Sequence, residues 1–429
     1  NATALQQEKH FFHWELEFPE VFVDLKHAKW LENPGFDALV GNPPWLGIRT
    51  GVFDSESLEW FKKNFVAAVG QFDLAALFIE LASLNTKPKG KIGFVVPKRI
   101  ATNESYEDLR KEISVDRKLR VLIDLGVAFE GVNNDALVLI SGSESEDEDK
   151  IIVGERLNKK QFNFWKVDAD IVEYLPFYIF PVNSSANELE IIKKVTKKAQ
   201  STFTDCAGDI TRGAECGMNH DAISKEPSEK SVEVLDHLEV GPYATNFSGW
   251  YVDSDKIESH ILKPIDLYKN IPKLLIRFLS SKLTVAVDDH GYVTTNLVYH
   301  VQVSKDVYYH CGYLSSKLLS FWYFHAFQND EVKFPHVQIS HLERLPVIAN
   351  SGESNSSSEV YTKQYNAFLN SNGLSKEILE EIGFDLSKFA YTIISFSSKK
   401  LHSLFKDKNK LLSALDPFKF LNKGVACKP

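Results

Sequence analysis

The stretch Gly35-Phe36-Asp37-Ala38-Leu39-Val40-Gly41-Asn42-Pro43-Pro44-Trp45 decides the fold prediction. Its apolar run over 36–40 predicts a short buried strand. Gly41 and the two prolines after it end this strand abruptly, because proline cannot donate to a strand ladder. Asn42 and Trp45 are therefore predicted to lie directly after the carboxyl end of a strand.

Helical and strand-like patterns alternate downstream of this stretch. Apolar residues recur at helical spacing in some segments, and short apolar runs bounded by turn residues indicate further strands. The predicted elements are helices at 55–69, 71–86 and 104–119, a turn at 89–91, and strands at 92–96, 121–125 and 136–140. This order is typical of an α/β domain with a largely parallel sheet, in which the last two strands are close enough to pair antiparallel.

Shifts in composition divide the rest of the chain. The first segment is aromatic and acidic and predicts an extended arm or short strand. The segment after the α/β domain leads out of it and ends in a lysine-rich helix. Turns rich in Gly, Asn, Asp and His then separate short strands, which indicates a mixed α+β domain, and a serine-rich linker precedes a helical tail. The predicted boundaries are 1–36, 37–150, 151–200, 201–350 and 351–429.

The overall composition is that of an ordinary globular protein. Of the 429 residues, 44% are hydrophobic and 25% are charged, which excludes wholesale disorder, collagen-like repeats and a disulfide-stapled miniprotein. No apolar stretch reaches the length of a membrane span. Segment 1–17 is polar and charged, which is not typical of a signal peptide. We therefore expect a cytoplasmic protein without a membrane partner.

Net charge and cysteine usage narrow the class of partner. The formal charge of −9 disfavours a protein that coats nucleic acid without specificity, but it does not exclude a basic cleft on an acidic body. The four cysteines show no CxxC spacing and are interpreted as reduced thiols. We predict no metal site, and Cys206, Cys216 and His220 are the alternative ligand set.

Asn42-Pro43-Pro44-Trp45 has the residue types needed to methylate an amino nitrogen that is conjugated to a ring or carbonyl. Such a nitrogen is a poor nucleophile because its lone pair is delocalised. The Asn42 amide oxygen and the Pro43 carbonyl would each accept an N–H hydrogen bond, which favours a tetrahedral nitrogen whose lone pair points at a methyl donor. Trp45 would stack on the base. The structural alternative is that the prolines merely end the strand and Trp45 belongs to the core.

With these residues the sequence resembles the DNA adenine N(6)-methyltransferases of the gamma arrangement. Segment 35–45 is similar to their catalytic motif, and the lead-in Phe11-Phe12-His13-Trp14-Glu15-Leu16-Glu17-Phe18-Pro19 is similar to that of type IIG restriction–modification enzymes and their solitary methylase relatives. The similarity continues in segments 71–78, 90–97 and 125–132. It implies that 37–150 is the C-terminal half of a catalytic domain, with a partial Rossmann-like methyltransferase sheet.

The resemblance also implies roles for single residues. Asn42, Pro43, Pro44 and Trp45 would hold an adenine flipped out of the duplex, and Phe129 would clamp its other face. A core position is the alternative for Phe129. The methyl donor would be S-adenosylmethionine, and the partner would be double-stranded DNA in a restriction–modification or phage-defence system.

The 201–350 domain resembles the TaqI-type C-terminal specificity domain, which recognises the DNA target. The similarity lies in 211–219, 273–277, 291–296 and 313–318, with Phe334-Pro335 and Leu345-Pro346. In such domains, glycine-rich turns bring backbone and side chains against DNA. The predicted DNA contacts are therefore Arg212, Asn219, Lys273 and Arg277, with a solvated surface position as the alternative for each.

One departure from the family affects the whole prediction. The family has a glycine-rich turn for S-adenosylmethionine upstream of its Asn-Pro-Pro motif, whereas the roughly forty residues before Asn42 contain no such turn. We therefore expect a C-terminal fragment of a longer protein, inactive without the missing N-terminal half of the same protein. The loss of strands would leave an unpaired sheet edge, covered by the 1–36 arm or by a second copy of the chain.

Two other functions stay open at this point. Protein glutamine methyltransferases use a similar Asn-Pro-Pro-aromatic loop, because an amide nitrogen poses the same lone-pair problem, but they have no need of a large sequence-reading domain. The second alternative is a non-catalytic DNA-binding specificity or assembly subunit, whose catalytic half is lost or supplied by another chain. Binding of duplex DNA would distinguish a protein glutamine methyltransferase from the two DNA-binding functions. The sequence upstream of this chain would show whether the protein is a non-catalytic subunit.

Overall fold

The computed structural model describes residues 12–128, 134–142, 149–243, 245–257, 259–264, 266–280, 282–304, 307–327 and 336–348. The chain divides into two compact units, of which the first comprises Asn1–Lys198 with Phe321–Asp330, and the second Ala199–Ser320 with Glu331–Pro429. The expected helical tail over 351–429, together with Phe129 and Phe334-Pro335, lies outside the described residues.

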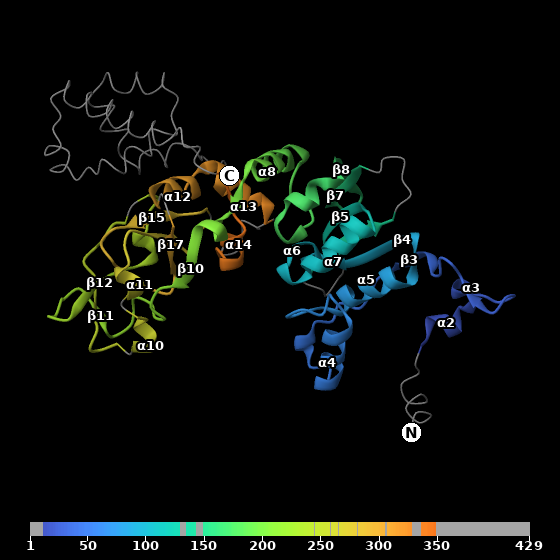
Figure 1. Cartoon of the computed structure of the whole chain (residues 1–429), viewed down its shortest axis with the longest axis horizontal. Coiled ribbons are helices and arrows are strands. Elements are labelled where there is room, and N and C mark those ends of the chain that lie inside the picture. Colours follow the sequence, from blue (N-terminus) through green and yellow to red (C-terminus); the bar gives the residue numbers. More distant parts are fainter. Residues whose placement is uncertain are drawn as a thin grey trace, which may run out of the picture. The chain divides into compact units, whose positions relative to one another are not determined.

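A six-stranded sheet forms the centre of the first unit (Figure 1). Its strands, in order across the sheet, are β3 (Phe36–Gly41), β4 (Thr86–Pro97), β6 (Asp135–Ser141), β5 (Leu119–Val127), β7 (Lys150–Asn158) and β8 (Gln161–Asp168). β3 is parallel to β4 and β5 is parallel to β7, whereas β6 and β8 are antiparallel to their neighbours. The carboxyl ends of β3, β4, β5 and β7 therefore share one edge, the carboxyl edge, where ligands bind in open α/β sheets.

Helices connect and cover these strands. They are α4 (Ser55–Asn64), α5 (Leu74–Asn85), α6 (Arg99–Thr102), α7 (Glu107–Lys111) and α8 (Ala186–Lys198), with the 3-10 turns η1 (Ile48–Thr50), η2 (Glu104–Tyr106), η4 (Ala169–Tyr174) and η5 (Pro176–Tyr178) and the π turn η3 (Glu112–Asp116). Aspartates cap α4 and α5: Asp54 accepts from the Ser57 N–H at 2.7 Å, and Asp73 accepts from the Ala75 N–H at 2.8 Å. Each cap satisfies a backbone donor that the first helical turn leaves free.

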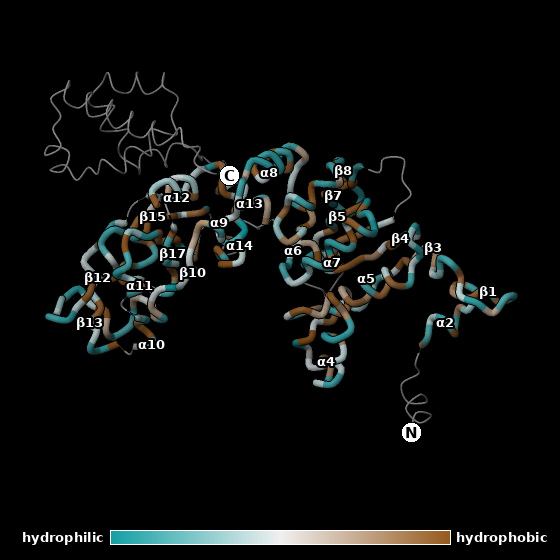
Figure 2. The backbone as a smooth tube through the Cα atoms, viewed as in Figure 1, coloured by the Kyte–Doolittle hydropathy of each residue, from teal (hydrophilic) through white to brown (hydrophobic). Residues whose placement is uncertain are grey.

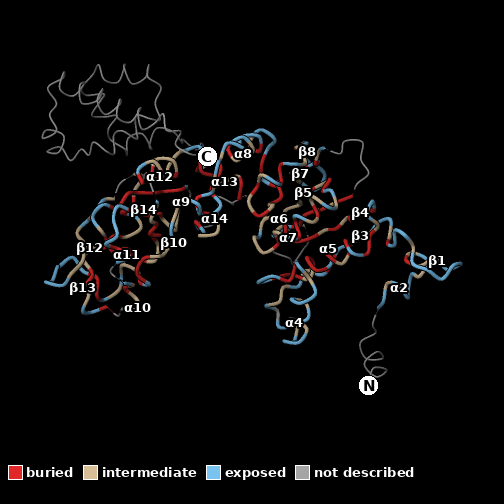
Figure 3. The backbone as a smooth tube through the Cα atoms, in the orientation of Figure 1, coloured by how far each residue is buried: buried red, intermediate tan, exposed pale blue. Residues whose placement is uncertain are grey.

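Alternation along the strands determines which face of the sheet is packed. On β4, Ile92 and Val96 are buried, whereas Gly93 and Val95 are half-buried. The largely apolar helix α5 packs against this strand. Figure 2 shows apolar residues along both elements, and Figure 3 shows that both are largely buried. Because successive side chains point to opposite faces, one face contains the core and the other is less covered among the described residues.

The strand that the decisive stretch predicts is present, but it is not buried. β3 lies at the end of the sheet and pairs with β4 alone within the described residues, and the side chain of Val40 is 84% exposed. The prediction of a buried strand was wrong here, because an apolar run is buried on both sides only where both neighbouring strands are present. Among the described residues, β3 is therefore an edge strand of this sheet.

β4 begins earlier than the sequence predicts. The expected turn at 89–91 lies inside the strand, at a shift in register between the Phe36–Thr86 and Ala38–Lys91 pairs. A Cβ atom on Gly90 would lie 2.8 Å from the Phe36 carbonyl oxygen, so only glycine allows this close approach. The glycine that suggested a turn is instead needed for contact between two strands.

The N-terminal segment forms α2 (Trp14–Glu17), α3 (Pro19–Phe22) and a small hairpin of β1 (Val23–Asp24) and β2 (Lys29–Trp30). Three of its rings surround Phe36, with centroid distances of 5.5 Å for Trp14, 5.4 Å for Phe18 and 5.7 Å for Phe22. The expectation of an extended arm was wrong over 14–22, where aromatic packing on Phe36 favours short helices. Much of this segment is exposed (Figure 3).

The segment over 151–200 contributes β7, β8 and α8 to the first unit. Arg110 ties part of it to the sheet connections, because its buried guanidinium donates to the carbonyls of Ile100 and Phe177 at 2.8 Å each. Burial lowers the pKa of Arg110 to about 9. These hydrogen bonds link the turn η5 to the residues that follow β4.

The second unit is a mixed α+β structure, as predicted. Its strands form the sheet β10 (Ala207–Arg212), β17 (Val298–Val303), β14 (Lys273–Arg277), β15 (Val285–Asp288), the sheet β11 (Ile223–Ser224), β13 (Tyr251–Asp253), β12 (Ser231–Leu235), β16 (Val293–Thr294), and the pair β9 (Ser201–Thr202), β18 (Pro346–Val347). The helical elements after residue 200 are α9 (Phe203–Cys206), η6 (His237–Glu239), α10 (Ser259–Leu262), α11 (Asp266–Lys269), α12 (Val307–Leu314), α13 (Lys317–Ala326) and α14 (Ile339–Glu343), of which the last part of α13 is assigned to the first unit.

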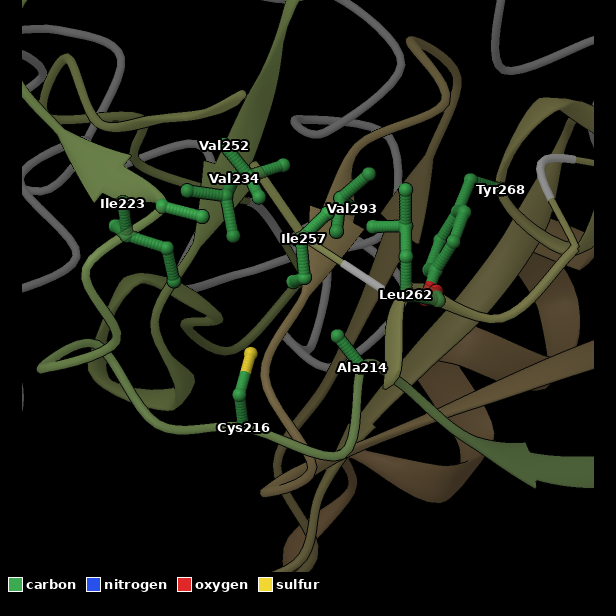
Figure 4. Packing of buried hydrophobic residues seen from close by; sticks show 10 residues of the cluster. Ala214, Cys216, Ile223, Val234, Val252, Ile257, Leu262, Tyr268 and Val293 are labelled. Atoms are coloured by element: carbon green, nitrogen blue, oxygen red, sulfur yellow. The ribbon is translucent and has the colours of Figure 1, made fainter. Parts of the chain in front are cut away.

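A cluster of buried residues holds the smaller of these sheets together (Figure 4). Its members include Cys216, Val234, Val252, Tyr268 and Val293. The pairing of β12 with β16 is parallel, and the cluster brings the turns before β11 against these strands. Within the described part of the chain, every helix is too short or too polar to cross a bilayer.

Candidate active site and DNA interface

The loop after β3 places the predicted catalytic residues at the carboxyl edge. Asn42 and Pro44 are exposed, Pro43 is buried and Trp45 is half-buried. The two prolines restrict the backbone dihedral angles, so the turn is stiff. They also lack N–H groups, so neither proline donates a hydrogen bond to the carbonyl groups of the turn. The Asn42 amide is therefore accessible beside a rigid backbone.

Trp45 is attached to the neighbouring strand. Its indole Nε1–H donates to the Val95 carbonyl oxygen in β4 at 3.3 Å. This hydrogen bond ties the ring to the sheet edge, and the residue as a whole is half-buried. The position differs from that of a core tryptophan such as Trp322, which is 1% exposed.

Backbone hydrogen bonds hold the rest of the loop against the start of α5. The Leu74 N–H donates to the Leu46 carbonyl at 2.9 Å, and the Ile48 N–H donates to the Phe72 carbonyl at 3.3 Å. Gly47 and Asp73 form a bridge between these two contacts. The Asn42 loop is therefore anchored at its far end as well as at Trp45.

Asp73 connects three segments that meet at this edge. Its side chain is fully buried, caps α5 through the Ala75 N–H, and forms an ion pair with the Arg99 guanidinium. Arg99 begins α6, directly after β4. Burial and the nearby Asp73 carboxylate also raise the pKa of Tyr106 to about 12. Sequence reasoning missed this role of Asp73, although an aspartate before an apolar helix is a recognisable capping signal.

A second ion pair lies between the ends of β4 and β5. The Lys98 Nζ is 2.6 Å from an Asp124 carboxylate oxygen, and both side chains are largely buried. The other Asp124 oxygen accepts from the Gly126 N–H at 2.8 Å, where the backbone has a φ of 56° that favours glycine. Phe129, the predicted base clamp, follows this turn but lies outside the described residues, so its role stays a prediction.

The predicted DNA contacts of the second unit are not brought together. Arg212 pairs with Tyr299 across β10 and β17, whereas Arg277 pairs with Val298 across β14 and β17, so the two arginines project from opposite faces of the sheet. Asn219 is exposed in the turn before β11.

The two arginines also differ in their surroundings. The Arg212 guanidinium carbon lies 4.2 Å from the centroid of the Phe278 ring, which is a cation–π arrangement that holds the group in place while leaving it partly exposed. The half-buried Arg277 has an Nε–H without a hydrogen-bond acceptor among the described residues, and burial lowers the pKa of Arg277.

Lys273 has a different role from the one predicted. Its side chain is 1% exposed, and its Nζ lies 2.6 Å from an Asp288 carboxylate oxygen and donates to the Tyr268 carbonyl. A buried, paired ammonium group is not available to a phosphate or base edge. The prediction of a DNA contact at Lys273 does not fit this placement. The residue pattern of β14 alone does not indicate that Asp288, on the neighbouring strand, pairs with Lys273.

The cysteine and histidine set that was the alternative for a metal site is not assembled. Cys216 belongs to the apolar cluster of Figure 4, and burial raises the pKa of its thiol. The His220 Nδ1 instead accepts from the Ala222 N–H at 3.2 Å. Among the described residues, no three His, Cys, Asp or Glu side chains are grouped as metal ligands.

Two family models match the chain. Residues 1–129 match the Eco57I restriction-modification methylase family, and residues 232–347 match the TaqI-like C-terminal specificity domain. The first match contains the whole Asn42 loop and α5, and the second contains β14 to β17 of the second unit.

Individual relatives are more distant. A candidate type II restriction enzyme and methyltransferase of Methanocaldococcus jannaschii is 24% identical over 79% of this chain and 28% of its own length. The type II restriction enzyme and methyltransferase RM.Eco57I of Escherichia coli is 27% identical over 38% of this chain and 16% of its own length. The chain thus spans less than a third of each of these two relatives.

A solved structure is also similar in outline. The Type IIL restriction-modification enzyme MmeI in complex with DNA matches 91% of this chain and 55% of its own, at 14% identity and a TM-score of 0.48. This likeness carries no argument, and the two family models are the basis of the comparison. Residues 1–129 are thus similar to the Eco57I restriction-modification methylase family, and residues 232–347 to the TaqI-like C-terminal specificity domain.

Proposed function

We propose that this chain provides the catalytic loop and the target-recognition domain of a site-specific DNA adenine N(6)-methyltransferase of a restriction–modification system. The observation that supports this most is the accessible Asn42 amide at the carboxyl edge, with the Trp45 ring fixed beside it through Val95. The similarity of both parts of the chain to these families agrees with it.

The proposed chemistry uses the acceptors of this loop. The exocyclic nitrogen of adenine has a delocalised lone pair, so it attacks a methyl donor poorly. The Asn42 amide oxygen and the Pro43 carbonyl would accept its two N–H hydrogen bonds and favour a tetrahedral nitrogen with a directed lone pair. The stiffness of the turn means that little reorganisation is needed as this geometry forms. No covalent enzyme intermediate is required.

The target adenine must leave the duplex to reach Asn42. Base flipping costs a few kcal/mol, which stacking on Trp45 would partly offset. Contacts of the second unit would select the sequence, with the partly exposed Arg212 and Asn219 as the better-placed candidates. An arginine that reads a guanine edge would contribute roughly 1–3 kcal/mol of discrimination at one base position.

S-adenosylmethionine would supply the methyl group. The described residues do not fit its main binding loop, because the connections that follow β3 and β4 contain the Asn42 turn and Lys98 and neither is a glycine-rich turn between strand and helix. We therefore assign no cofactor contact to this chain. We propose that the N-terminal half of the same protein contributes it, and that the isolated chain does not methylate DNA.

Base-resolution sequencing tests this function. We expect the full gene product, expressed in a host without adenine methylation, to leave N(6)-methyladenine at one recurring sequence of the genome. Asn42→Ala should abolish the modification while the affinity for duplex DNA stays within a few fold, because the Asn42 amide contacts only the flipped base.

Asn64→Ala is a matched control. It removes another exposed amide, whose Nδ2 donates to the Trp60 carbonyl of its own helix at 2.7 Å, and it should leave the modification unchanged. Retained modification by the Asn42→Ala protein would remove Asn42 from catalysis. A different methylated product, such as protein glutamine with unmodified DNA, would overturn the proposed function.

A further inference from the structure

The β7–β8 hairpin lies between the two family matches, which end at residue 129 and begin again at residue 232. Because β7 is parallel to β5 and β5 runs in the same direction as β3, the tip of this hairpin projects at the carboxyl edge that also bears Asn42. Figure 1 shows β5, β7 and β8 in succession. Four strand spacings separate β3 from β7, which is about 19 Å across the sheet. The strand pairings put Gly41 level with Val153, so the tip at Lys159 also lies six residues, or about 20 Å, further along the strands.

The tip of the hairpin is basic. Lys159 and Lys160 form its turn, both are exposed, and neither forms an ion pair among the described residues. The Lys160 N–H donates to the Asn158 side chain at 3.0 Å, which orders the turn. Glu155, the nearest acidic residue on β7, accepts from Asn163 at 3.2 Å and lies on the other face from Phe164. Positive charge therefore dominates at the end that points toward the carboxyl edge.

Two aromatic rings line one face of the same hairpin. Phe162 and Phe164 are stacked with centroids 5.9 Å apart and planes at 16°, and they are 39% and 53% exposed. Phe164 pairs with Gly154, and a Cβ atom there would lie 2.5 Å from the Phe164 ring, so this ring rests directly on the glycine backbone. The aromatic face is thus held in one orientation before any ligand binds, which reduces the entropy lost on binding.

The hairpin is also fixed to the strand that leads to the predicted base clamp. Arg156 lies opposite Phe162, and its Nη2 donates to the Val127 carbonyl at the end of β5 at 2.7 Å. The lysine-bearing tip is therefore held in a defined position relative to the carboxyl edge. A duplex that is bound at Asn42 and extends along this edge toward β7 would pass the tip.

We propose that the β7–β8 hairpin is a second DNA-contact surface, which binds the sugar–phosphate backbone of the duplex beside the target base. Lys159 and Lys160 contact phosphates, and the ring pair Phe162–Phe164 packs against the sugars of the same strand. The contact is independent of sequence, because phosphates and sugars are common to all DNA. This proposal rests on the proposed function, since it requires that the chain binds duplex DNA.

The salt dependence of binding tests the charged part of the surface. The variant K159Q/K160Q, made in the full chain, should lower the slope of log affinity against log salt by about 1.8 for a random-sequence duplex, since each phosphate contact contributes about 0.9. The matched control is K89Q/K91Q, which removes two exposed lysines near the opposite end of β4. The control should keep the slope of the unchanged protein.

A ring variant tests the apolar part separately. Phe162→Ala should weaken binding by roughly tenfold without changing the slope, because it removes packing and no charge. Phe162 is the better choice, since Phe164 covers Gly154 and its loss would disturb the hairpin itself. Thermal melting of each variant shows whether the fold is retained.

Each outcome decides between the two proposals. If the unchanged chain binds duplex DNA and K159Q/K160Q keeps its slope, the hairpin proposal fails and the proposed function stands. If the unchanged chain binds no duplex at any salt concentration, both proposals fail. A lower slope in K159Q/K160Q alone, with an unchanged control, supports the hairpin as a phosphate-binding surface.

Discussion

The indole nitrogen of Trp45 and the carbonyl oxygen of Val95 lie 3.3 Å apart. The ring that we propose to stack on the target base is therefore hydrogen-bonded to the neighbouring strand of the sheet. This hydrogen bond uses the only polar atom of the indole, so stacking on a base would involve the ring alone. Ring orientation and stacking are therefore separable properties of one side chain.

Substitutions at Trp45 should separate these two properties. Trp45→Phe keeps a flat ring but loses the N–H donor, which is worth about 1 kcal/mol, so kcat/KM for methylation by the full protein should fall less than tenfold. Trp45→Ala also removes stacking worth roughly 1–3 kcal/mol and should lower kcat/KM further by one to two orders of magnitude. Equal losses in the two variants would show that the ring does not stack on the base.

The ion pair between Asp73 and Arg99 should stabilise the loop that contains Asn42. Arg99→Ala would leave the fully buried Asp73 carboxylate without its cation, at a cost of about 2 kcal/mol in unfolding free energy. The loop residues bridged to Asp73 should exchange their amide hydrogens faster, which mass spectrometry measures. Arg49→Ala is a useful control, since Arg49 donates to Gln71 at the exposed side of the same loop. Unchanged exchange in Arg99→Ala would show that other contacts anchor the loop.

The parts of this site that the sequence predicts are the local ones. An apolar run stopped by two prolines is enough to predict β3 and the position of Asn42 after it. The insertion of β6 between β4 and β5 was not predicted, because strand order depends on pairing between distant segments. The sequence likewise predicts a connecting segment over 151–200, where the structure has the β7–β8 hairpin.

Burial was also hard to predict from strand patterns. The run over 36–40 predicted a buried strand, but the sheet ends at β3 and exposes Val40. Lys273, at the start of a strand, suggested a surface cation, but Asp288 on the adjacent strand pairs with it in the interior. In both cases the outcome depends on what lies on the neighbouring strand, and a single sequence does not contain that information.

The Lys273–Asp288 pair should contribute to stability and not to DNA recognition. Lys273→Met removes the cation from the buried Asp288 carboxylate and should cost about 3–5 kcal/mol in unfolding free energy. K273M/D288L should recover part of this loss, because it also removes the hydrogen bonds that Asp288 accepts from the His290 and Gly291 N–H groups. A double-mutant cycle by chemical denaturation measures the coupling. A K273M/D288L protein that folds normally but binds DNA with a smaller salt dependence would restore Lys273 as a DNA contact.

His300 should make the stability of the second unit depend on pH. Burial and the nearby Lys273 lower the pKa of His300 to about 3, and its Nε2 lies 2.8 Å from the Thr294 hydroxyl. The unfolded chain binds a proton near pH 6.5 and the folded chain does not, so this contribution is fully present above pH 6.5 and is lost as the pH falls toward 3. The expected slope is about 1.4 kcal/mol per pH unit within this window.

His300→Gln removes the titrating group and tests this expectation. Hydrogen exchange in β14 and β17 measures the opening free energy of both proteins. Between pH 7 and pH 5, the unchanged protein should lose about 2 kcal/mol of this free energy relative to His300→Gln. Carboxylates titrate equally in both proteins and cancel in the difference. His290→Gln, at an exposed histidine outside β14 and β17, is the matched control for the substitution itself. Parallel behaviour of His300→Gln and the unchanged protein would mean that His300 accepts a proton in the folded state.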